Sequence, residues 1–336
     1  MSARSRLHGI IEAFPSRRVV LYGDLVLDRF VLGTPKRISR EAPVIILRFE
    51  GQRDIPGGGA NALANLAALG ATVLPVGVVG DDEPGASLLG ALARAGVDVS
   101  GIARLPGFRT VTKVRILAGG AASLKHQIAR YDVEDHLPSH DGWHDALTAR
   151  IAAVARGAHA AAVSDYGYGA VFADGMARLR SALPAGAPVV ADSRFGLEAL
   201  GTVDGATPNL EELAAATGTV PEGEVAVAAA ADALRAKLGA RFVAATRGSE
   251  GLTLVEDGKP ALHLPVFGTD QVADVTGAGD TVLATLALAL AAGAEPAEAA
   301  ALANLAGGVV VTKLGTATVS RAELHRAVDL APFVHD

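Results

Sequence analysis

Several residue types and patterns are scarce in this chain of 336 residues, and each absence narrows the possible functions. The chain contains no cysteine, which excludes disulfide bridges, thiolate catalysis and zinc sites built on cysteine. Aromatic residues make up 4% of the chain while 50% of it is hydrophobic, so the core must consist mainly of Ala, Val and Leu. The formal net charge of −6 disfavours nucleic acid as a partner, because nucleic-acid-binding domains are usually basic.

Long hydrophobic segments are also lacking. The longest apolar run, residues 282–294, is shorter than the roughly 20 residues that cross a bilayer. The N-terminal segment is basic, but its apolar run is short and interrupted by Glu12, which does not fit a signal peptide. We therefore expect a cytoplasmic protein that does not bind membranes. The motif G-x-x-x-x-G-K-[S/T] is absent as well, which excludes a P-loop.

The sequence does contain a regular alternation of apolar strands and helices. Most of the apolar segments end on Asp, Asn or Gly, and they lie within residues 17–24, 72–82, 158–167, 187–194, 205–209 and 241–248. Such an alternation predicts an α/β fold with a mainly parallel central sheet, flanked by helices that form right-handed crossovers. Ligands of open α/β sheets bind at the carboxyl ends of the strands, where these polar residues would gather.

Two segments depart from this alternation. Residues 30–53 and 110–131 mix β-branched and charged residues and show no helical period. We interpret them as a small separate β-sheet that covers the strand ends as a lid, because long excursions from a compact domain are often functional. The alternative is a long edge hairpin without a function.

The segment GGGANA, residues 57–62, has the form of a dinucleotide-binding fingerprint, G-x-G-x-x-A. That fingerprint requires a strand directly before its glycines. Pro56 and the polar residues before it do not indicate such a strand, so we do not expect an NAD site here.

Three histidines at a spacing of four, His136, His140 and His144, raise the question of a zinc site. Pro138 and Gly142 interrupt any common helix face between them. The spacing alone therefore does not support zinc, and we interpret the segment as a polar connector.

The segment DVTGAGDT, residues 274–281, directly precedes the most apolar helix. The small residues Gly277, Ala278 and Gly279 let the backbone approach a ligand closely, and the N–H groups of a helix beginning at about Asp280 attract anions. A helix cap would explain Asp280 but not three consecutive small residues. An acid beside an anion site therefore predicts chemistry at this position.

Two segments, PGGGANALANLAALGA (56–71) and DVTGAGDTVLATLALALAAG (274–293), resemble the two signatures of the PfkB (ribokinase-like) carbohydrate kinases. Further segments, such as YGDLVLDRFVLGTPKRISREAPV, VSDYGYGA and TPNLEEL, are similar to the kinase half of the heptose-7-phosphate kinase/adenylyltransferase proteins. The resemblance covers almost the whole chain. It implies one ribokinase-like α/β domain over residues 1–336 with a β lid.

The activity that the resemblance implies is ATP-dependent phosphorylation of a sugar or sugar phosphate. Heptose 7-phosphate, phosphorylated at its anomeric position, is the first candidate. Within the class, the alternative is a kinase for another sugar or for a nucleoside. Outside it, the alternative is a catalytically silent regulator that binds a sugar or nucleotide.

The resemblance also assigns roles around the GAGD motif. It implies that Asp280 is the base that takes the proton from the sugar hydroxyl. The backbone N–H groups of Gly277, Ala278, Gly279 and Asp280 would form the anion hole for the phosphoryl group. Phosphoryl transfer depends mainly on positioning and charge stabilisation, which these groups can supply.

The sugar site implied by the resemblance comprises Asp28, which would bind two sugar hydroxyls, together with Gly57, Gly58, Asn61 and Asp165. Asp28, Asn61 and Asp165 also have ordinary structural explanations, because Asp and Asn are common in turns, in the first turns of helices and in loops.

A phosphorylated sugar also needs cations. Heptose kinases commonly carry lysines where this chain has Tyr168 and Arg194, so Arg194 is our first candidate for the phosphate. The further lid candidates are Lys113, Arg130, Lys36 and Arg37.

The nucleotide site follows from the resemblance as well. Asn209 and Glu212 form the N-x-x-E pattern that is linked to Mg²⁺ and its waters, which suits a cation that prefers oxygen ligands. The loop of Asp274 and Thr276 resembles a site for a monovalent cation, with K⁺ as the candidate. The remaining assignments are Thr246 and Gly248 near the triphosphate and ribose, and Asn304 in the adenine pocket.

The lid leads to one prediction about assembly. Its strand edges would be poorly covered in a monomer, and exposed edges tend to be paired or covered. We therefore predict a homodimer formed through the lid strands.

Overall fold

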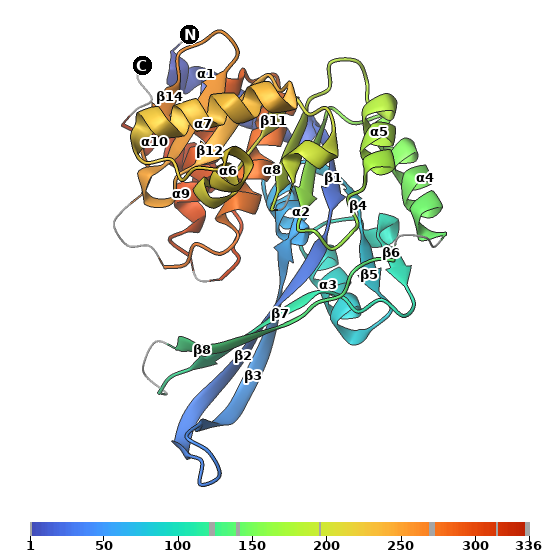
Figure 1. The fold of residues 1–336 in the computed structure, drawn as a ribbon, viewed down its shortest axis with the longest axis vertical. Helices are drawn as coiled ribbons and strands as arrows, with labels where there is room; N and C mark the ends of the chain where they lie inside the picture. Colours follow the sequence, from blue (N-terminus) through green and yellow to red (C-terminus); the bar gives the residue numbers. More distant parts are fainter. Residues whose placement is uncertain are drawn as a thin grey trace.

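A mixed sheet lies at the centre of the protein (Figure 1). The structure is a computed structural model that describes residues 2–120, 125–138, 142–194, 196–268, 273–313 and 315–332. Within these residues the strand order is β14-β13-β12-β11-β10-β9-β1-β4. Neighbouring strands from β4 to β12 are parallel, which confirms the predicted sheet, whereas β13 and β14 form an antiparallel edge that was not predicted. The strands are β1 Arg18–Gly23, β4 Thr72–Val76, β9 Ala160–Asp165, β10 Val189–Ser193, β11 Gly205–Ala206, β12 Phe242–Thr246, β13 Leu252–Glu256 and β14 Leu262–Leu264.

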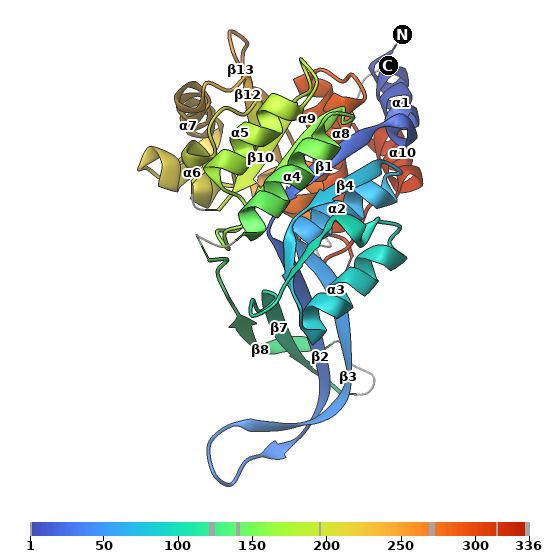
Figure 2. The ribbon, with the colours of Figure 1, turned by 90° about the vertical axis from the view of Figure 1, so that its right-hand side faces the viewer.

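Helices cover both faces of this sheet (Figures 1 and 2). Successive strand residues point to opposite faces, so Val19 and Leu21 of β1 enter one core while Val20 and Tyr22 enter the other. The first core includes residues of α1, α2, α3, α8, α9 and α10, and the second includes residues of α4, α5, α6 and α7. The helices are α1 Ala3–Ala13, α2 Gly59–Ala68, α3 Glu83–Arg94, α4 Trp143–Ala155, α5 Ala173–Ala182, α6 Leu210–Thr217, α7 Gly223–Leu238, α8 Ala278–Ala291, α9 Pro296–Val310 and α10 Arg321–Leu330.

A second, smaller sheet extends away from the body of the protein (Figures 1 and 2). Its strand order is β3-β2-β7-β8, and β2 pairs antiparallel with β3 and parallel with β7. The predicted separate sheet is thus present, but its first two strands reach closer to the body than residues 30–53. Its role as a lid stays a prediction, as does the single domain. The strands are β2 Leu25–Ile38, β3 Ile45–Gly58, β7 Thr112–Ala118 and β8 His126–Val133.

The longer strands correct one reason given above. Pro56 lies within β3 and pairs with Leu27, so the expectation that no strand precedes the glycines is wrong. The strand β3 therefore runs directly into α2. It belongs to the small sheet, however, while β4 after α2 belongs to the large one, so these elements do not form the βαβ unit of a dinucleotide-binding fold.

The predicted strand at residues 72–82 is divided. Its first part is β4 of the large sheet, and its second part, β5 Val78–Gly80, pairs with β6 Ala103–Leu105 in a two-stranded sheet. In the described part of the chain, none of the helices has both the length and the apolar composition of a membrane-crossing helix.

The histidine segment forms no common site in the part of the chain that the structure describes. The His136 ring contacts Tyr168, with centroids 5.8 Å apart, whereas His144 stacks on Trp143 at 3.8 Å. His140 lies outside the described residues. No cluster of three metal-ligating side chains was found among the described residues.

Candidate active site

Asp280 lies in the first turn of α8, at the carboxyl end of the large sheet. The helix begins two residues before the predicted start, and its N-cap is Gly277, whose φ of 80° places it in the left-handed region. A Cβ at this position would clash with the amide nitrogen of Asn61, so the turn requires glycine. Asp280 therefore does not cap the helix. Its side chain is 3% exposed, close to the N–H groups of the first turn.

Two donors hold the carboxylate of Asp280. Asn61 Nδ2 donates to Oδ2 at 3.2 Å, and the hydroxyl of Tyr166 donates to Oδ1 at 2.9 Å. Burial raises the pKa of Asp280 to about 7, although both hydrogen bonds lower it; Asp28 raises it further and Lys113 lowers it. A carboxylate with a pKa near neutral pH is suited to accept a proton from a substrate hydroxyl.

Asn65 holds the first of these donors in place. It lies one helical turn after Asn61 in α2 and donates to the Asn61 carbonyl at 3.0 Å and to Asn61 Oδ1 at 3.2 Å. Its own Oδ1 accepts the Val319 N–H at 3.2 Å. This i, i+4 pair of asparagines in a buried helix was a signal that the sequence analysis missed.

Asp24 holds the second donor. This residue separates β1 from β2, and its carboxylate accepts backbone N–H groups from Tyr166 at 2.8 Å and Ala170 at 3.0 Å. Burial raises the pKa of Asp24 to about 6, while these backbone hydrogen bonds lower it. The loop after β9 is thereby tied to the end of β1. Asp24 closes a predicted strand, but the sequence did not show what it would bind.

A polar cavity of about 340 Å³ lies beside Asp280. Burial, together with Glu212 and Asp280, raises the pKa of Asp192 well above its ordinary value. Burial also raises the pKa of Glu212, although Arg194 lowers it. The cavity thus concentrates acids around one arginine. Its walls include Asp165, Asp192, Arg194, Thr207, Glu212 and Asp280.

The N-x-x-E pattern forms a capping box at the start of α6. Asn209 Oδ1 accepts the Glu212 N–H at 2.9 Å, and Glu212 Oε2 accepts the Asn209 N–H at 2.8 Å. Both residues also line the polar cavity. The pattern therefore has a structural function in starting this helix, in addition to the metal role that the resemblance implies.

A larger cavity of about 820 Å³ adjoins the polar one, and Gly279, Asn209 and Thr246 belong to the walls of both. Asn304 lies in its wall and donates to the Pro265 carbonyl at 2.8 Å. The predicted nucleotide residues Thr246, Gly248 and Asn304 are thus brought together. Glu211 and Arg247 also line this cavity, and many of its remaining wall residues are small or apolar, among them Gly251, Leu252, Val266, Val282, Gly307, Gly308 and Val311.

Charged residues of the small sheet face the same region. Asp28 forms a buried ion pair with Arg115, a residue that the sequence analysis did not select. Lys113 is 8% exposed, and its pKa is lowered by burial, raised by Asp28, and lowered further by Arg130 and Arg194. Arg130 Nε donates to Asp132 Oδ1 at 2.8 Å. Three predicted cations therefore lie close enough to influence one another.

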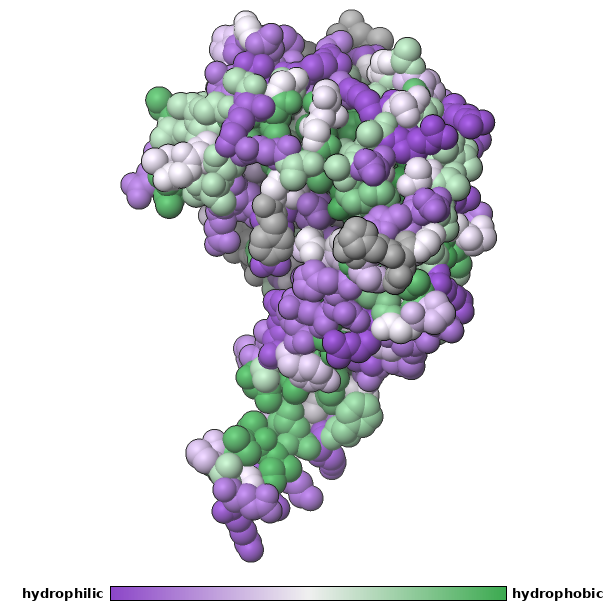
Figure 3. Space-filling model, turned by 45° about the vertical axis from the view of Figure 1, so that its right-hand side comes forward, coloured by the Kyte–Doolittle hydropathy of each residue, from purple (hydrophilic) through white to green (hydrophobic). Residues whose placement is uncertain are grey.

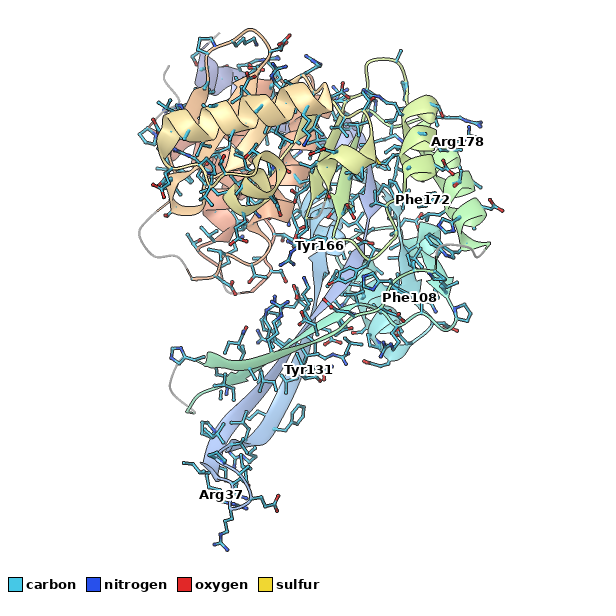
Figure 4. All side chains as sticks on the ribbon, in the orientation of Figure 1. Arg37, Phe108, Tyr131, Tyr166, Phe172 and Arg178 are labelled. Carbon is cyan, nitrogen blue, oxygen red and sulfur yellow. The ribbon has the colours of Figure 1, made fainter. Side chains whose placement is uncertain are left out.

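The two other cations proposed for the lid lie elsewhere. Lys36 and Arg37 belong to the outer part of β2, where both are exposed. Figure 4 shows Arg37 at the far end of the small sheet, remote from Tyr166. The structure therefore does not bring these two residues to the candidate site, because they lie near the far end of the β2–β3 hairpin, which extends away from the body.

Three further predicted residues have structural contacts. Asp165 accepts the Gly167 N–H at 3.0 Å and the Ser193 hydroxyl at 2.7 Å. These contacts agree with its structural explanation as a residue that holds a loop. Gly57 lies against the Asp28 carboxylate. Asp274 accepts the Thr276 N–H at 2.9 Å and the Gly315 N–H at 3.1 Å, so it shapes the loop before α8.

Residues 16–323 match the pfkB family of carbohydrate kinases. The chain belongs to this family. It is 43% identical over 319 residues to the bifunctional protein HldE of Azotobacter vinelandii, covering 94% of this chain and 64% of the relative. HldE of Caulobacter vibrioides is also 43% identical, over 320 residues, covering 93% and 64%. The chain thus spans slightly less than two thirds of the length of these relatives.

Solved structures show the same fold. Arabidopsis thaliana ribokinase complexed with ribose and ATP has a TM-score of 0.73 at 22% identity, covering 94% of this chain and 99% of that one. Escherichia coli phosphofructokinase-2 in complex with substrates and products has a TM-score of 0.75 at 21% identity, with the same coverage. The predicted ribokinase-like fold and the carbohydrate kinase class are therefore confirmed.

Proposed function

We propose that the protein transfers the terminal phosphoryl group of ATP to a hydroxyl of a phosphorylated sugar, with heptose 7-phosphate as the first candidate. The observation that carries the proposal is the position of Asp280. It lies at the turn where the larger cavity meets the polar cavity. The phosphates of a nucleotide in the larger cavity would reach this carboxylate through the polar cavity, and a sugar beside Asp28 and Lys113 would meet them there.

The chemical step follows from this position. The acceptor hydroxyl gives its proton to the Asp280 carboxylate as its oxygen forms a bond to the terminal phosphorus of ATP. The bond between that phosphorus and the oxygen bridging to ADP breaks, and ADP leaves with the electron pair. N–H groups at the start of α8 stabilise the transferred charge. The Ala278 N–H already donates to the Val275 carbonyl at 3.2 Å, so we assign this role to Gly277, Gly279 and Asp280.

The donor set around the polar cavity fits a magnesium ion that keeps most of its waters. Glu212 is the carboxylate that would hold it, with the remaining positions taken by water and phosphate oxygens. Bound there, the ion would neutralise phosphate charge. A K⁺ site at Asp274 and Thr276 is supported by the family resemblance and by a phosphofructokinase-2 structure in complex with potassium.

The charges of the sugar side favour a substrate that is already phosphorylated. Lys113 and Arg115 are buried cations on this side, and Asp28 forms an ion pair with Arg115. Burial lowers the pKa of Lys113, so an anion beside it would stabilise its charged form, and a phosphate dianion would supply that charge. The HldE relatives support heptose 7-phosphate among phosphorylated sugars.

A substrate panel tests the proposal. ADP release from ATP is measured with heptose 7-phosphate, unphosphorylated heptose, fructose 6-phosphate, ribose and a nucleoside. Phosphorus NMR of the product then locates the new phosphate. We expect the highest kcat/KM for heptose 7-phosphate and a phosphate on the anomeric oxygen. A clear preference for a neutral sugar or nucleoside would retire the phosphosugar proposal while keeping the kinase class.

We also propose that a second copy of the chain binds to the small sheet. The sheet carries exposed apolar residues far from the main core, and Figure 3 shows an apolar patch on the extension. Exposed apolar patches of this kind mark interaction sites. The exposed apolar residues of the small sheet and of the loop between β2 and β3 are Ile38, Val44, Ile45, Phe49, Ile128 and Tyr131.

A further inference from the structure

Tyr166 has no role in the sequence analysis, yet it contacts both halves of the candidate site. We propose that Tyr166 is a positioning residue that orients the Asp280 carboxylate and couples it to Lys113 of the small sheet. Figure 4 shows Tyr166 at the lower edge of the body, facing the small sheet. The inference rests on the proposed role of Asp280 as the base.

The hydroxyl of Tyr166 contacts the base directly. It donates to Asp280 Oδ1 at 2.9 Å, while Asn61 occupies Oδ2 at 3.2 Å. Burial and the nearby Asp280 raise the pKa of Tyr166 well above its ordinary value. The phenol therefore keeps its proton and acts as a fixed donor. With one donor on each oxygen, the carboxylate is held in one orientation, and its remaining lone pairs can receive the substrate proton.

The ring of Tyr166 contacts the substrate side. Lys113 Nζ lies 5.1 Å from the ring centroid, a cation–π distance. The same side chain therefore touches the base through its hydroxyl and a proposed phosphate-binding cation through its ring. A substrate anion that changes the position of Lys113 would therefore change its contact with Tyr166, the residue that orients the Asp280 carboxylate.

The position of Tyr166 is fixed from two other sides. Its backbone N–H donates to Asp24 Oδ2 at 2.8 Å. A Cβ at Gly58 would lie 3.1 Å from Tyr166 Cε2, so the absence of a side chain there makes room for the ring. The contacts with Asp280 and Lys113 thus come from a ring that the backbone itself holds in place.

The hydroxyl should set the pH at which the base becomes active. A donor stabilises the charged carboxylate, so its removal raises the pKa of Asp280. A general base works in its deprotonated form, and the rising limb of the pH–rate profile would move to higher pH. The other charged or titratable groups around Asp280 include Asp28 of β2, Lys113 of β7, Asp165 of β9, Asp192 of β10, Arg194 after β10, and Glu211 and Glu212 of α6.

Two substitutions separate the hydroxyl from the ring. Tyr166→Phe removes only the hydroxyl; we expect the rising limb of kcat/KM to move up by about one pH unit and kcat at neutral pH to fall about tenfold. The KM for ATP should not change. Tyr166→Leu also removes the ring beneath Lys113, and we expect an additional rise of about tenfold in the KM for the phosphosugar.

The matched control is Tyr22→Phe. The buried Tyr22 hydroxyl accepts the Phe172 N–H at 3.1 Å, whereas Asp280 accepts its two hydrogen bonds from Asn61 and Tyr166. The pH–rate profile of the Tyr22→Phe variant should coincide with that of the wild type. Thermal unfolding of each variant is measured to check that the variant is folded. A second probe keeps the side chain intact: 3-fluorotyrosine at position 166 makes the phenol a stronger donor and should move the rising limb to lower pH.

Each outcome is decisive. A Tyr166→Phe profile that coincides with the wild type, or a fluorotyrosine protein without a shift, overturns the inference. Asp280→Asn distinguishes this from a failure of the proposed function. If Asp280→Asn turns over almost normally, the assignment of the base is wrong. If it is inactive while Tyr166→Phe leaves the profile unchanged, the base stands and Tyr166 is merely structural.

Discussion

The side-chain amide of Asn61 in α2 lies 3.2 Å from Asp280 Oδ2 in α8, and it also lies 3.1 Å from the carbonyl of Gly277. The two residues are 219 positions apart in the chain. One amide thus fixes both the acid and the turn before it. The carboxylate is thereby placed relative to the N–H groups of the turn before any substrate binds, which is the preorganisation that phosphoryl transfer needs.

Asp280→Asn is expected to lower kcat by about 10² to 10⁴-fold, because an amide cannot accept the proton of the hydroxyl. The affinity for ATP should stay nearly unchanged, since the walls of the larger cavity are not altered. Steady-state kinetics and a separate ATP titration measure the two quantities.

The same substitution needs a structural control. Asp280 accepts from two donors on two oxygens, and asparagine offers one oxygen, so either Asn61 or Tyr166 loses its acceptor. Thermal unfolding should therefore show a folded variant of somewhat lower stability. A folded variant with near-normal turnover would contradict the role of Asp280 as the base.

The pH dependence of the wild type offers an independent measurement. Burial raises the pKa of Asp280 from 3.8 to about 7. The base is active when deprotonated, so kcat/KM should be low at acidic pH and rise through about pH 7. An enzyme with an ordinary aspartate as its base would already be fully active at pH 5 to 6, about one to two units above the usual pKa of aspartate. A profile that is flat from pH 5 upward would contradict the raised pKa of this carboxylate.

Local patterns predicted the fold better than they predicted the site. The strand and helix alternation and the helix after the GAGD motif are local properties, and both appear in the structure. The antiparallel edge formed by β13 and β14 was missed because the prediction relied on strands alternating with helices, and no α-helix separates β12, β13 and β14. The break at Gly77 was missed because an apolar segment does not show which sheet it joins.

The contacts of the site depend on distant parts of the chain. Tyr166 reaches Asp280 because Asp24 holds its loop, and the partner of Asp28 proved to be Arg115 on a neighbouring strand. A motif identifies an acid near a helix end but does not show which donor faces each oxygen. The family resemblance therefore selected Asp280 and the cations as candidates, but it did not indicate which residues contact them.

The phosphate of the substrate should depend on specific cations. Removing one charge-assisted contact costs about 1.5–3 kcal/mol, so Arg194→Ala should raise the KM for a phosphosugar roughly ten- to a hundredfold. Lys113→Ala should act in the same direction, because Lys113 is the buried cation proposed to face the phosphate from the small sheet. The affinity for ATP should change little. Arg178→Ala is the control, since this exposed arginine lies in α5, away from the small sheet (Figure 4).

The outcome for a neutral substrate would be different. If the natural substrate carries no phosphate, Arg194→Ala should leave its KM within a few-fold of the wild type. Inorganic phosphate should then not compete with it. Finding both results would exclude heptose 7-phosphate as the substrate and leave the chain as a carbohydrate kinase of another specificity.

The small sheet should determine the oligomeric state. Phe49 in β3 is 66% exposed, and a second copy that covers the apolar residues of this sheet would bury it. A charge placed there would have to be buried without a partner, which opposes association. Light scattering at micromolar concentration should give the wild type about twice the chain mass of 34.0 kDa, and Phe49→Glu the mass of one chain.

Val225→Glu should remain dimeric, because Val225 is 85% exposed but lies in α7, outside the small sheet. A wild type that is monomeric and fully active would contradict the proposed dimer, and a dimeric Phe49→Glu would place the interface elsewhere.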